Sequence, residues 1–303
     1  MRFTITLLVF FLLSGFNLAA QSLAPTTTDT TLLWRISDNG LEKASYLFGT
    51  IHMIPADDYF LPATVESALA ASDRVAFEID TREMENPATI FGLMGKMNML
   101  NDTTLADLLT KEEYAMVTEH FEKAGLPMML FERMKPMFLS AMIGQDLKDL
   151  AGGFGGANAT KSYEIELTNI AKTGKKEILG LETIDFQLSL FDSIPYTVQA
   201  DMLVSAINSE SDPAADDQFA QMVDMYKRRA VAEMASMISE ESSDSGNFEE
   251  LLLTKRNISW IAPMQELMAK GTTFFAVGAG HLGNDKGVIA LLRSKGYSVE
   301  PVY

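Results

Sequence analysis

Hydrophobic runs of strand length alternate with helical segments near both ends of the chain. Close to the N-terminus, β-prone runs over residues 32–37 and 46–51 flank an Asn-Gly pair, a pattern typical of a β-hairpin. A proline then opens a helix over 62–71, and a short apolar strand follows over 74–79. This end of the chain is therefore predicted to contribute three strands and one helix.

The C-terminal part of the chain repeats the alternation. Pro263 marks a point at which one of its helices could break. Strands that alternate with helices in this way predict an α/β fold, with a central mixed β-sheet flanked by helices. The predicted strands cover 177–181, 272–277 and 298–302, and the predicted helices cover 249–270 and 286–294.

The middle of the chain is mainly helical. Thr110 and Glu113 form a capping box that starts a helix toward Lys123, and another helix follows Pro136 and runs to about residue 150. These patterns predict helical insertions at about 83–150 and 184–245 within one domain. Further helices are predicted over 161–172, 184–207 and 214–239, followed by a polar acidic loop at 240–246.

Two features of this helical region have an ordinary and a functional interpretation. Methionines recur at helical spacing, which we interpret as core or as a loosely packed cap and not as a ligand site. The Gly-rich stretch 152–156 is either a linker or a mobile lid over a site. The methionines in question are Met222, Met225, Met234 and Met237.

The first 20 residues have the organisation of a secretory signal peptide. Arg2 gives a short positive region, an apolar run covers 3–16, and cleavage after Ala20 satisfies the small-residue rule. The alternative is an uncleaved membrane anchor, although the run is short for a membrane span. We expect an exported, periplasmic or extracellular protein whose mature form does not span the membrane. A flexible leader at 21–31 would precede a single domain over 32–303.

Composition narrows the chemistry that is available. The formal net charge is −17, and the sequence shows no basic face of the kind that a nucleic-acid groove needs. The absence of cysteine excludes disulfides, thiolate nucleophiles and cysteine-based zinc sites. A metal would therefore have to be bound by oxygen ligands and by the three histidines, His52, His120 and His281.

Two of the three histidines occur in Gly-x-x-His segments. Gly49 to His52 and Gly278 to His281 each follow a hydrophobic strand and precede a predicted helix. Because ligands of open α/β sheets bind at the carboxyl ends of strands, we expect both histidines at one rim of the sheet. Glycine at this point permits a sharp turn and a close approach of the backbone.

Two further strands end in carboxylates, Glu78 and Glu182. If these strands lie beside the histidine-bearing strands, two imidazoles and two carboxylates converge and could bind a divalent cation. Such a cation would acidify a bound water toward a pKa of about 7. A carboxylate outside the metal shell could act as general base.

Each of these residues also has a structural interpretation. A single Gly-x-x-His is a weak signal, and a strand-end glutamate is commonly a solvated residue. His120 lies on a predicted surface helix and is interpreted as structural. Other routes to catalysis lack their motifs, since the sequence contains no Gly-x-Ser-x-Gly elbow, P-loop or His-Glu-x-x-His. The pairing of the two motifs with the two glutamates is what favours a site.

The ordered set of motifs resembles the TraB/GumN family, which includes the Tiki proteases and the pheromone-shutdown protein PrgY. The resemblance covers nearly all of the chain after the predicted signal peptide. It rests on Leu33-Trp34-Arg35-Ile36, Leu47-Phe48-Gly49-Thr50-Ile51-His52, Phe77-Glu78-Ile79-Asp80, Leu181-Glu182-Thr183 with Gln187, Arg256-Asn257 with Trp260, and Val277-Gly278-Ala279-Gly280-His281-Leu282.

The resemblance implies a fold related to erythromycin esterases and haem-binding ChaN-like proteins, and a metal-dependent proteolytic site. It implies His52, His281 and Glu78 first, then Glu182, as catalytic and metal-binding residues. The metal would be a divalent ion such as Mn, Co or Zn. Arg256 would orient a carboxylate or a substrate anion, since its planar fork suits bidentate pairing, and Asn257 and Gln187 would support the site.

The leading hypothesis is therefore an exported metal-dependent hydrolase, most simply a peptidase, with a peptide or protein substrate. A second hypothesis is a binding protein that sequesters a peptide or haem without turnover, using the same pocket. Haem would need an axial ligand such as histidine and an apolar cleft. A third is an interaction module with a vestigial site.

Overall fold

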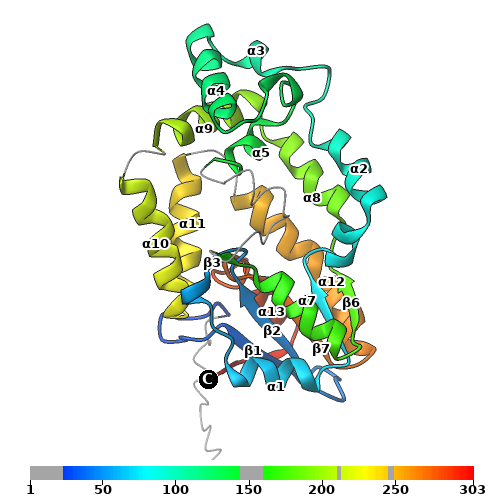
Figure 1. Ribbon diagram of the computed structural model, residues 1–303. Coiled ribbons are helices and arrows are strands. Elements are labelled where there is room, and N and C mark those ends of the chain that lie inside the picture. Colours follow the sequence, from blue (N-terminus) through cyan, green and yellow to red (C-terminus); the bar gives the residue numbers. More distant parts are fainter. Residues whose placement is uncertain (1–22, 144–159, 210–212, 245–248) are drawn as a thin grey trace, which may run out of the picture.

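The computed structural model describes residues 23–143, 160–209, 213–244 and 249–303 of the chain. The predicted signal peptide and the Gly-rich stretch 152–156 lie outside the described residues. Within them, no helix is both long and apolar enough to cross a membrane. Figure 1 shows a sheet at one end of the molecule and a group of helices at the other.

A six-stranded mixed sheet forms the core of the fold, which confirms the predicted α/β class. Its strand order is β6-β4-β7-β2-β1-β8, and β6, β4, β7 and β2 are parallel neighbours, whereas β1 pairs antiparallel with β2 and β8. The strands are β1 (Leu33–Ser37), β2 (Ser45–Thr50), β4 (Arg74–Phe77), β6 (Glu177–Gly180), β7 (Thr273–Gly278) and β8 (Ser298–Val302).

The hydrophobic runs explain this sheet. Strand β7 is central and is buried along almost its whole length, with Phe274 and Phe275 fully buried. The β1–β2 connection contains the predicted Asn-Gly turn, where Asp38, Asn39 and Gly40 all have positive φ angles. A second, two-stranded sheet pairs β3 (Ile54–Pro55) with β5 (Thr160–Lys161).

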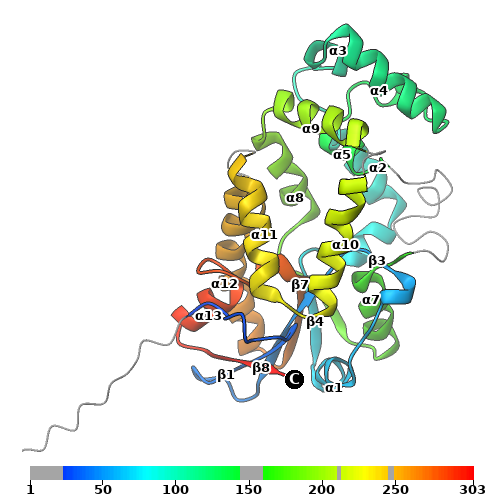
Figure 2. The same cartoon turned by 90° about the vertical axis from the view of Figure 1, so that its left-hand side faces the viewer.

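Helices cover both faces of the sheet. Helices α1 (Ala63–Ala71) and α7 (Tyr163–Thr173) lie on one face, and α12 (Lys255–Ala269) and α13 (Val288–Ser294) lie on the other (Figures 1 and 2). Helices α8 (Ile184–Leu190), α10 (Pro213–Lys227) and α11 (Val231–Asp244) extend from the sheet toward the far end of the molecule (Figure 2).

The far end is a helical, Met-rich region with its own hydrophobic cluster, separate from the core on the sheet. Its helices are α2 (Pro87–Lys96), α3 (Leu105–Leu108), α4 (Lys111–Lys123), α5 (Pro136–Ser140) and α9 (Tyr196–Ser209). The capping box at Thr110 and Glu113 is present as predicted. The cluster contains Met99, Leu105, Val117, Phe121, Met128, Leu139 and Leu203.

Several predicted helices are shorter or divided. The segment 184–207 is interrupted at Pro195, which lies between the turn η4 (Phe191–Ser193) and α9 and has no N–H to donate. The segment 214–239 is divided between α10 and α11 at Arg229, whose φ is +60°. Helix α5 after Pro136 ends at Ser140 and a turn covers 141–143, and the rest of the helix predicted to about residue 150 lies outside the described residues.

The acidic loop predicted at 240–246 was wrong in its described part, whereas the helix predicted over 249–270 was confirmed, with a π-helical first turn. Helix α11 continues to Asp244, so the acidic residues up to that point are helical and do not form a loop. The helix predicted over 249–270 consists of a π-helical turn, Glu250–Thr254, followed by α12. Helix α12 continues through Pro263 without a break, because burial of Trp260, Ile261 and Met264 outweighs one missing backbone hydrogen bond.

Candidate active site

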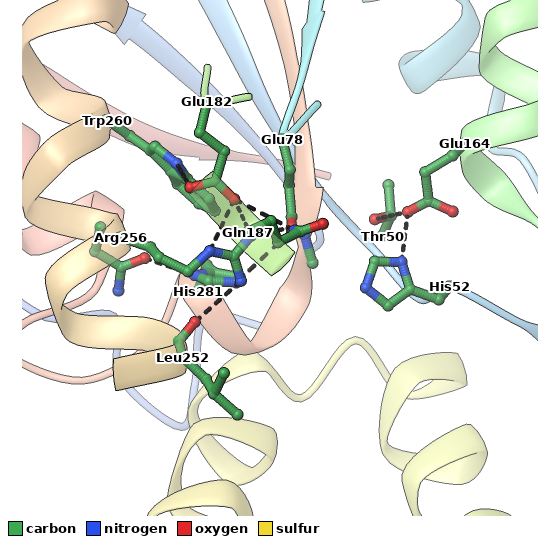
Figure 3. A network of polar contacts seen from close by, with 12 residues as sticks. Thr50, His52, Glu78, Glu164, Glu182, Gln187, Leu252, Arg256, Trp260 and His281 are labelled. Atoms are coloured by element: carbon green, nitrogen blue, oxygen red, sulfur yellow. Dashed lines mark hydrogen bonds and ion pairs between the residues drawn. The ribbon is translucent and has the colours of Figure 1, made fainter. Parts of the chain in front are cut away.

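The four strand ends singled out by sequence meet at one edge of the sheet. Because β6, β4, β7 and β2 are parallel neighbours, their carboxyl ends lie side by side. Glu182, Glu78, His281 and His52 follow the ends of β6, β4, β7 and β2 respectively, so all four come to the one rim that the strand-end pattern predicted. Figure 3 shows the group, with His52 facing Glu78 across the site.

Three of these four residues line one cavity. His52, Glu78 and His281 share a cavity of about 190 Å³ at the edge of the sheet. Glu182 does not line this cavity, because its carboxylate points to Arg256 and Trp260 instead (Figure 3). The structure therefore divides the four predicted ligands into three at the cavity and one behind it.

Arg256 on helix α12 joins the two carboxylates. Its Nη2 donates to Glu78 Oε2 at 2.5 Å and to Glu182 Oε1 at 2.6 Å, while its Nε donates to Glu182 Oε1 at 2.9 Å. The side chains of all three residues are at most 10% exposed. The guanidinium is thus the shared counter-charge of two buried carboxylates, but it pairs bidentately with neither, because its Nε and Nη2 contact the same oxygen of Glu182.

Glu182 has a full set of donors. Besides Arg256, it accepts a hydrogen bond from Trp260 Nε1 at 2.8 Å and one from Gln187 Nε2 at 3.3 Å. Gln187 also donates to Glu78 Oε2 at 3.3 Å, so it supports both carboxylates. These contacts show that Glu182 holds the side chains of Arg256 and Trp260 in place.

His281 is held in one orientation by Asn257. Its Nδ1 lies 2.6 Å from Asn257 Oδ1, and the Asn257 amide is oriented by its own donation to the carbonyl of Lys286 at 3.0 Å. Since an amide oxygen can only accept, this network assigns the ring proton to Nδ1 and leaves the lone pair on Nε2. Asn257 is therefore a hydrogen-bond partner of His281 from the neighbouring helix α12.

The charge states of the buried pair follow from their surroundings. Burial lowers the pKa of His281 to about 3, so the ring is neutral at neutral pH. Burial alone would raise the pKa of Glu78, but the adjacent His281, Arg256, His52 and the Gly278 N–H at 2.8 Å lower it to about 2. Because His281 is neutral, we take Arg256 to be the cation that keeps Glu78 ionised.

His52 has a separate partner that sequence reasoning missed. Its Nδ1 lies 3.2 Å from Glu164 Oε1, which also accepts from Thr50 Oγ1 at 2.8 Å, while Ser162 Oγ donates to Glu164 Oε2 at 2.9 Å. The hydrogen bond to Glu164 raises the pKa of His52, an effect that solvent screens because the imidazole is 73% exposed.

The donor set fits a divalent ion in part. His281 Nε2 and Glu78 Oε1 are 3.6 Å apart. Two ligand atoms on one tetrahedral or trigonal zinc ion are separated by about 3.3–3.7 Å, so this pair has a suitable spacing. Within the described residues, however, no three histidine, aspartate or glutamate side chains are grouped closely enough to hold a metal ion. Arg256 Nη1 also lies 3.2 Å from His281 Nε2 and competes for its lone pair.

Comparison with known proteins gives a family and several distant relatives. The profile of the TraB/PrgY/gumN family matches residues 32–301. The chain is similar to Metalloprotease TIKI1 of Danio rerio, with 24% identity over 91% of this chain and 64% of that protein. It is also similar to Metalloprotease TIKI1 of Homo sapiens, with 23% identity over 89% of this chain and 61% of that protein.

A third relative, the Metalloprotease TIKI homolog of Amphimedon queenslandica, is 22% identical over 90% of this chain and 61% of its own length. The chain thus spans about three fifths of the length of the curated relatives it matches. No solved structure matches the chain.

Proposed function

The chain belongs to the TraB/PrgY/gumN family, and from that premise we propose that it is a metal-dependent hydrolase that cleaves peptides or proteins outside the cytoplasm. The similarity to proteins named metalloproteases by itself supports only a hydrolase in the broad sense. The proposal goes further and names the substrate class, the metal and the location. The site would be the cavity shared by His52, Glu78 and His281.

One observation supports the proposal above the others: both Gly-x-x-His histidines are oriented through Nδ1. Asn257 holds His281 in this way, and Glu164 holds His52. Metal-binding histidines usually donate their other ring N–H to a carboxylate or carbonyl, which fixes the tautomer and leaves the second nitrogen as the ligand. Two independent motifs with the same arrangement are hard to explain as ordinary strand ends.

The chain's residues would then have distinct roles. His281 Nε2 and Glu78 Oε1, which have a suitable spacing, would hold a divalent ion such as Mn, Co or Zn, and His52 would have to move toward them from across the cavity to become a third ligand. When bound, such an ion acidifies water and polarises a carbonyl. Arg256 keeps Glu78 ionised by its contact at 2.5 Å, and Glu182 and Gln187 fix Arg256 and Glu78 from behind. With a pKa of about 2, Glu78 suits a ligand better than a general base.

Elemental analysis of the purified protein tests the proposal. The wild type should contain about one divalent ion per chain, and His281→Ala and His52→Ala should each lose it. His120→Gln on α4 is the matched control and should retain the ion, because His120 lies outside the cavity. Unchanged metal content in both cavity variants would refute the metal site. Peptide cleavage should disappear with a chelator and return with added metal.

A second candidate is peptide binding without cleavage, and one contact favours it. Arg256 Nη1 lies 3.2 Å from His281 Nε2, so a cation already occupies the neighbourhood of the proposed ligands. Peptide that binds but is never cleaved, with or without metal, would support this candidate. Haem has less support, because the cavity of about 190 Å³ is smaller than the roughly 300–1,000 Å³ of pockets for drug-sized ligands.

Export is part of the proposal and has its own test. The first 20 residues have the pattern of a secretory signal peptide, and cleavage is proposed after Ala20. Expression of the full chain, followed by N-terminal sequencing of the protein outside the cytoplasm, should give Gln21 as the first residue. A full-length chain retained in the membrane fraction would instead support an uncleaved anchor.

A further inference from the structure

The cavity at the proposed active site has two unlike walls. One wall is polar and contains His52, Glu78 and His281. The other is apolar and comes from helices α10 and α11 and from the π-helical turn before α12. The side chains of this apolar wall are Met222, Tyr226, Met234, Met237, Ile238 and Leu253.

The apolar wall is attached directly to the loop that contains His281. A Cβ atom on Gly283 would lie 2.4 Å from Cβ of Ala235 and 3.0 Å from the carbonyl oxygen of Val231, both on α11. A Cβ on Gly280 would lie 2.5 Å from Cδ1 of Ile238. Helix α11 can pack this closely because position 283 is glycine, since Cβ of Ala235 and the backbone of Val231 cannot move aside, whereas the end of the Ile238 side chain near Gly280 could. The apolar wall and the imidazole of His281 are therefore held at a fixed separation.

The wall offers an incoming group few polar contacts. Tyr226 is the one hydroxyl among the apolar-wall residues, and it donates to the carbonyl of Gly49 at 3.0 Å. The remaining side chains are methionine, isoleucine and leucine. An isolated charge placed against such a surface would lose its hydration without gaining a partner. The wall thus favours an apolar group and disfavours a charged one.

The size of the cavity fits one side chain. An apolar cavity of about 150 Å³ in another protein is large enough to bind benzene. The cavity described here, at about 190 Å³, can therefore admit one leucine-, methionine- or phenylalanine-sized group. Because methionine side chains are flexible and polarizable, three of them in one wall should accept several apolar shapes and not a single one.

We propose that this apolar wall is a specificity pocket, which receives one apolar side chain of a peptide and so places the neighbouring peptide bond beside His281 and Glu78. The inference rests on the proposed function in so far as the substrate is taken to be a peptide. It assigns a role in substrate choice to the Met-rich helices α10 and α11, which the sequence suggested only as core or cap.

The test uses a set of fluorescent peptides that differ at a single position, occupied by Leu, Met, Phe, Asp or Lys. Binding is measured by anisotropy in the presence of a chelator, and cleavage is measured by mass spectrometry with metal present. The apolar peptides should bind and react on the order of tenfold or more better than the charged ones, the discrimination that one buried apolar group typically gives.

Substitutions at Met237 locate the effect. Met237→Asp should remove most of the preference for Leu and Phe. Met129→Asp is the control and should leave the preference unchanged, because Met129 is 83% exposed and does not line the cavity. Met237→Ala guards against a simple folding defect: it should move the preference toward larger groups such as Phe, because it enlarges the pocket.

The outcomes separate the two proposals. Cleavage with equal rates for Leu, Asp and Lys peptides would overturn the specificity pocket and leave the hydrolase standing. Selective binding of apolar peptides without any cleavage would support the pocket and contradict the hydrolase. A preference that Met237→Asp and Met129→Asp reduce equally, or the absence of any binding to apolar peptides, would overturn the pocket.

Discussion

Removal of the Arg256 guanidinium should destabilise the protein more than any surface ion-pair substitution. Arg256→Met keeps an unbranched side chain, while the charge and the stacking of the guanidinium over Trp260 at 4.9 Å are lost. Two carboxylates, Glu78 and Glu182, then remain buried without a cation, since their side chains are 10% and 4% exposed. They also repel each other.

The magnitude follows from the cost of an unpaired buried charge. Removal of one partner from a buried ion pair typically costs about 3–5 kcal/mol, because the remaining charge cannot regain its hydration. At about 2–4 °C per kcal/mol for a domain of this size, Tm should fall by roughly 6–20 °C. The double variant Arg256→Met with Glu182→Gln should recover part of that loss, because only one buried carboxylate, Glu78, then remains without a cation.

Thermal and urea denaturation followed by circular dichroism, without added metal, measures the effect. Arg228→Met is the matched control: Arg228 also contacts two carboxylates, Asp224 and Glu233, but all three side chains are between 46% and 65% exposed. Water replaces such contacts, so its Tm should scarcely change. If Arg256→Met and Arg228→Met melt together, burial does not govern this network and the reasoning is wrong.

Three other substitutions test neighbouring contacts. Glu164→Gln should lower the pKa of His52 toward 6.5, measured by NMR titration, because the hydrogen bond that raises it is weakened; an unchanged pKa would remove Glu164 as its partner. Gly283→Val should cost about 1–3 kcal/mol in urea denaturation, because its Cβ would lie 2.4 Å from Cβ of Ala235. The folded-state pKa of Glu78, about 2 against 4.5 in the unfolded chain, gives stability that is complete above pH 4.5 and is lost as the pH falls through 2, so Glu78→Gln should flatten that part of the pH–stability curve; parallel curves would contradict it.

The sheet was predictable because its strands are short apolar runs bounded by turns. Phe274 to Val277 is an uninterrupted hydrophobic run, and all four residues are buried in the central strand. Such a run has the same appearance whichever strand it pairs with, so the order β6-β4-β7-β2-β1-β8 did not follow from the sequence. The long helices were less predictable, since Arg229 adopts its left-handed φ without a glycine to signal it.

The candidate-site residues were predictable where the position of each one is set by the end of the strand that it follows. His52, Glu78 and His281 follow strand ends, and parallel pairing is enough to bring them to one edge. Glu164 was missed because its approach to His52 depends on the short pairing of β3 with β5, a contact between segments more than 100 residues apart. Nothing in the local sequence around Glu164 distinguishes it from a solvated first-turn glutamate.

The strand order also explains why Glu78 lines the cavity and Glu182 does not, although both follow strand ends. Glu182 follows the edge strand β6, where Arg256 and Trp260 of α12 cover it, whereas Glu78 follows β4, beside the central strand β7. Arg256 balances one of the two carboxylates, His281 is neutral and His52 is paired with Glu164, so one negative charge remains at the cavity wall. That charge would attract a cation and repel an acidic substrate group. A peptide that presents an apolar side chain to α10 and α11 should therefore carry no carboxylate beside it.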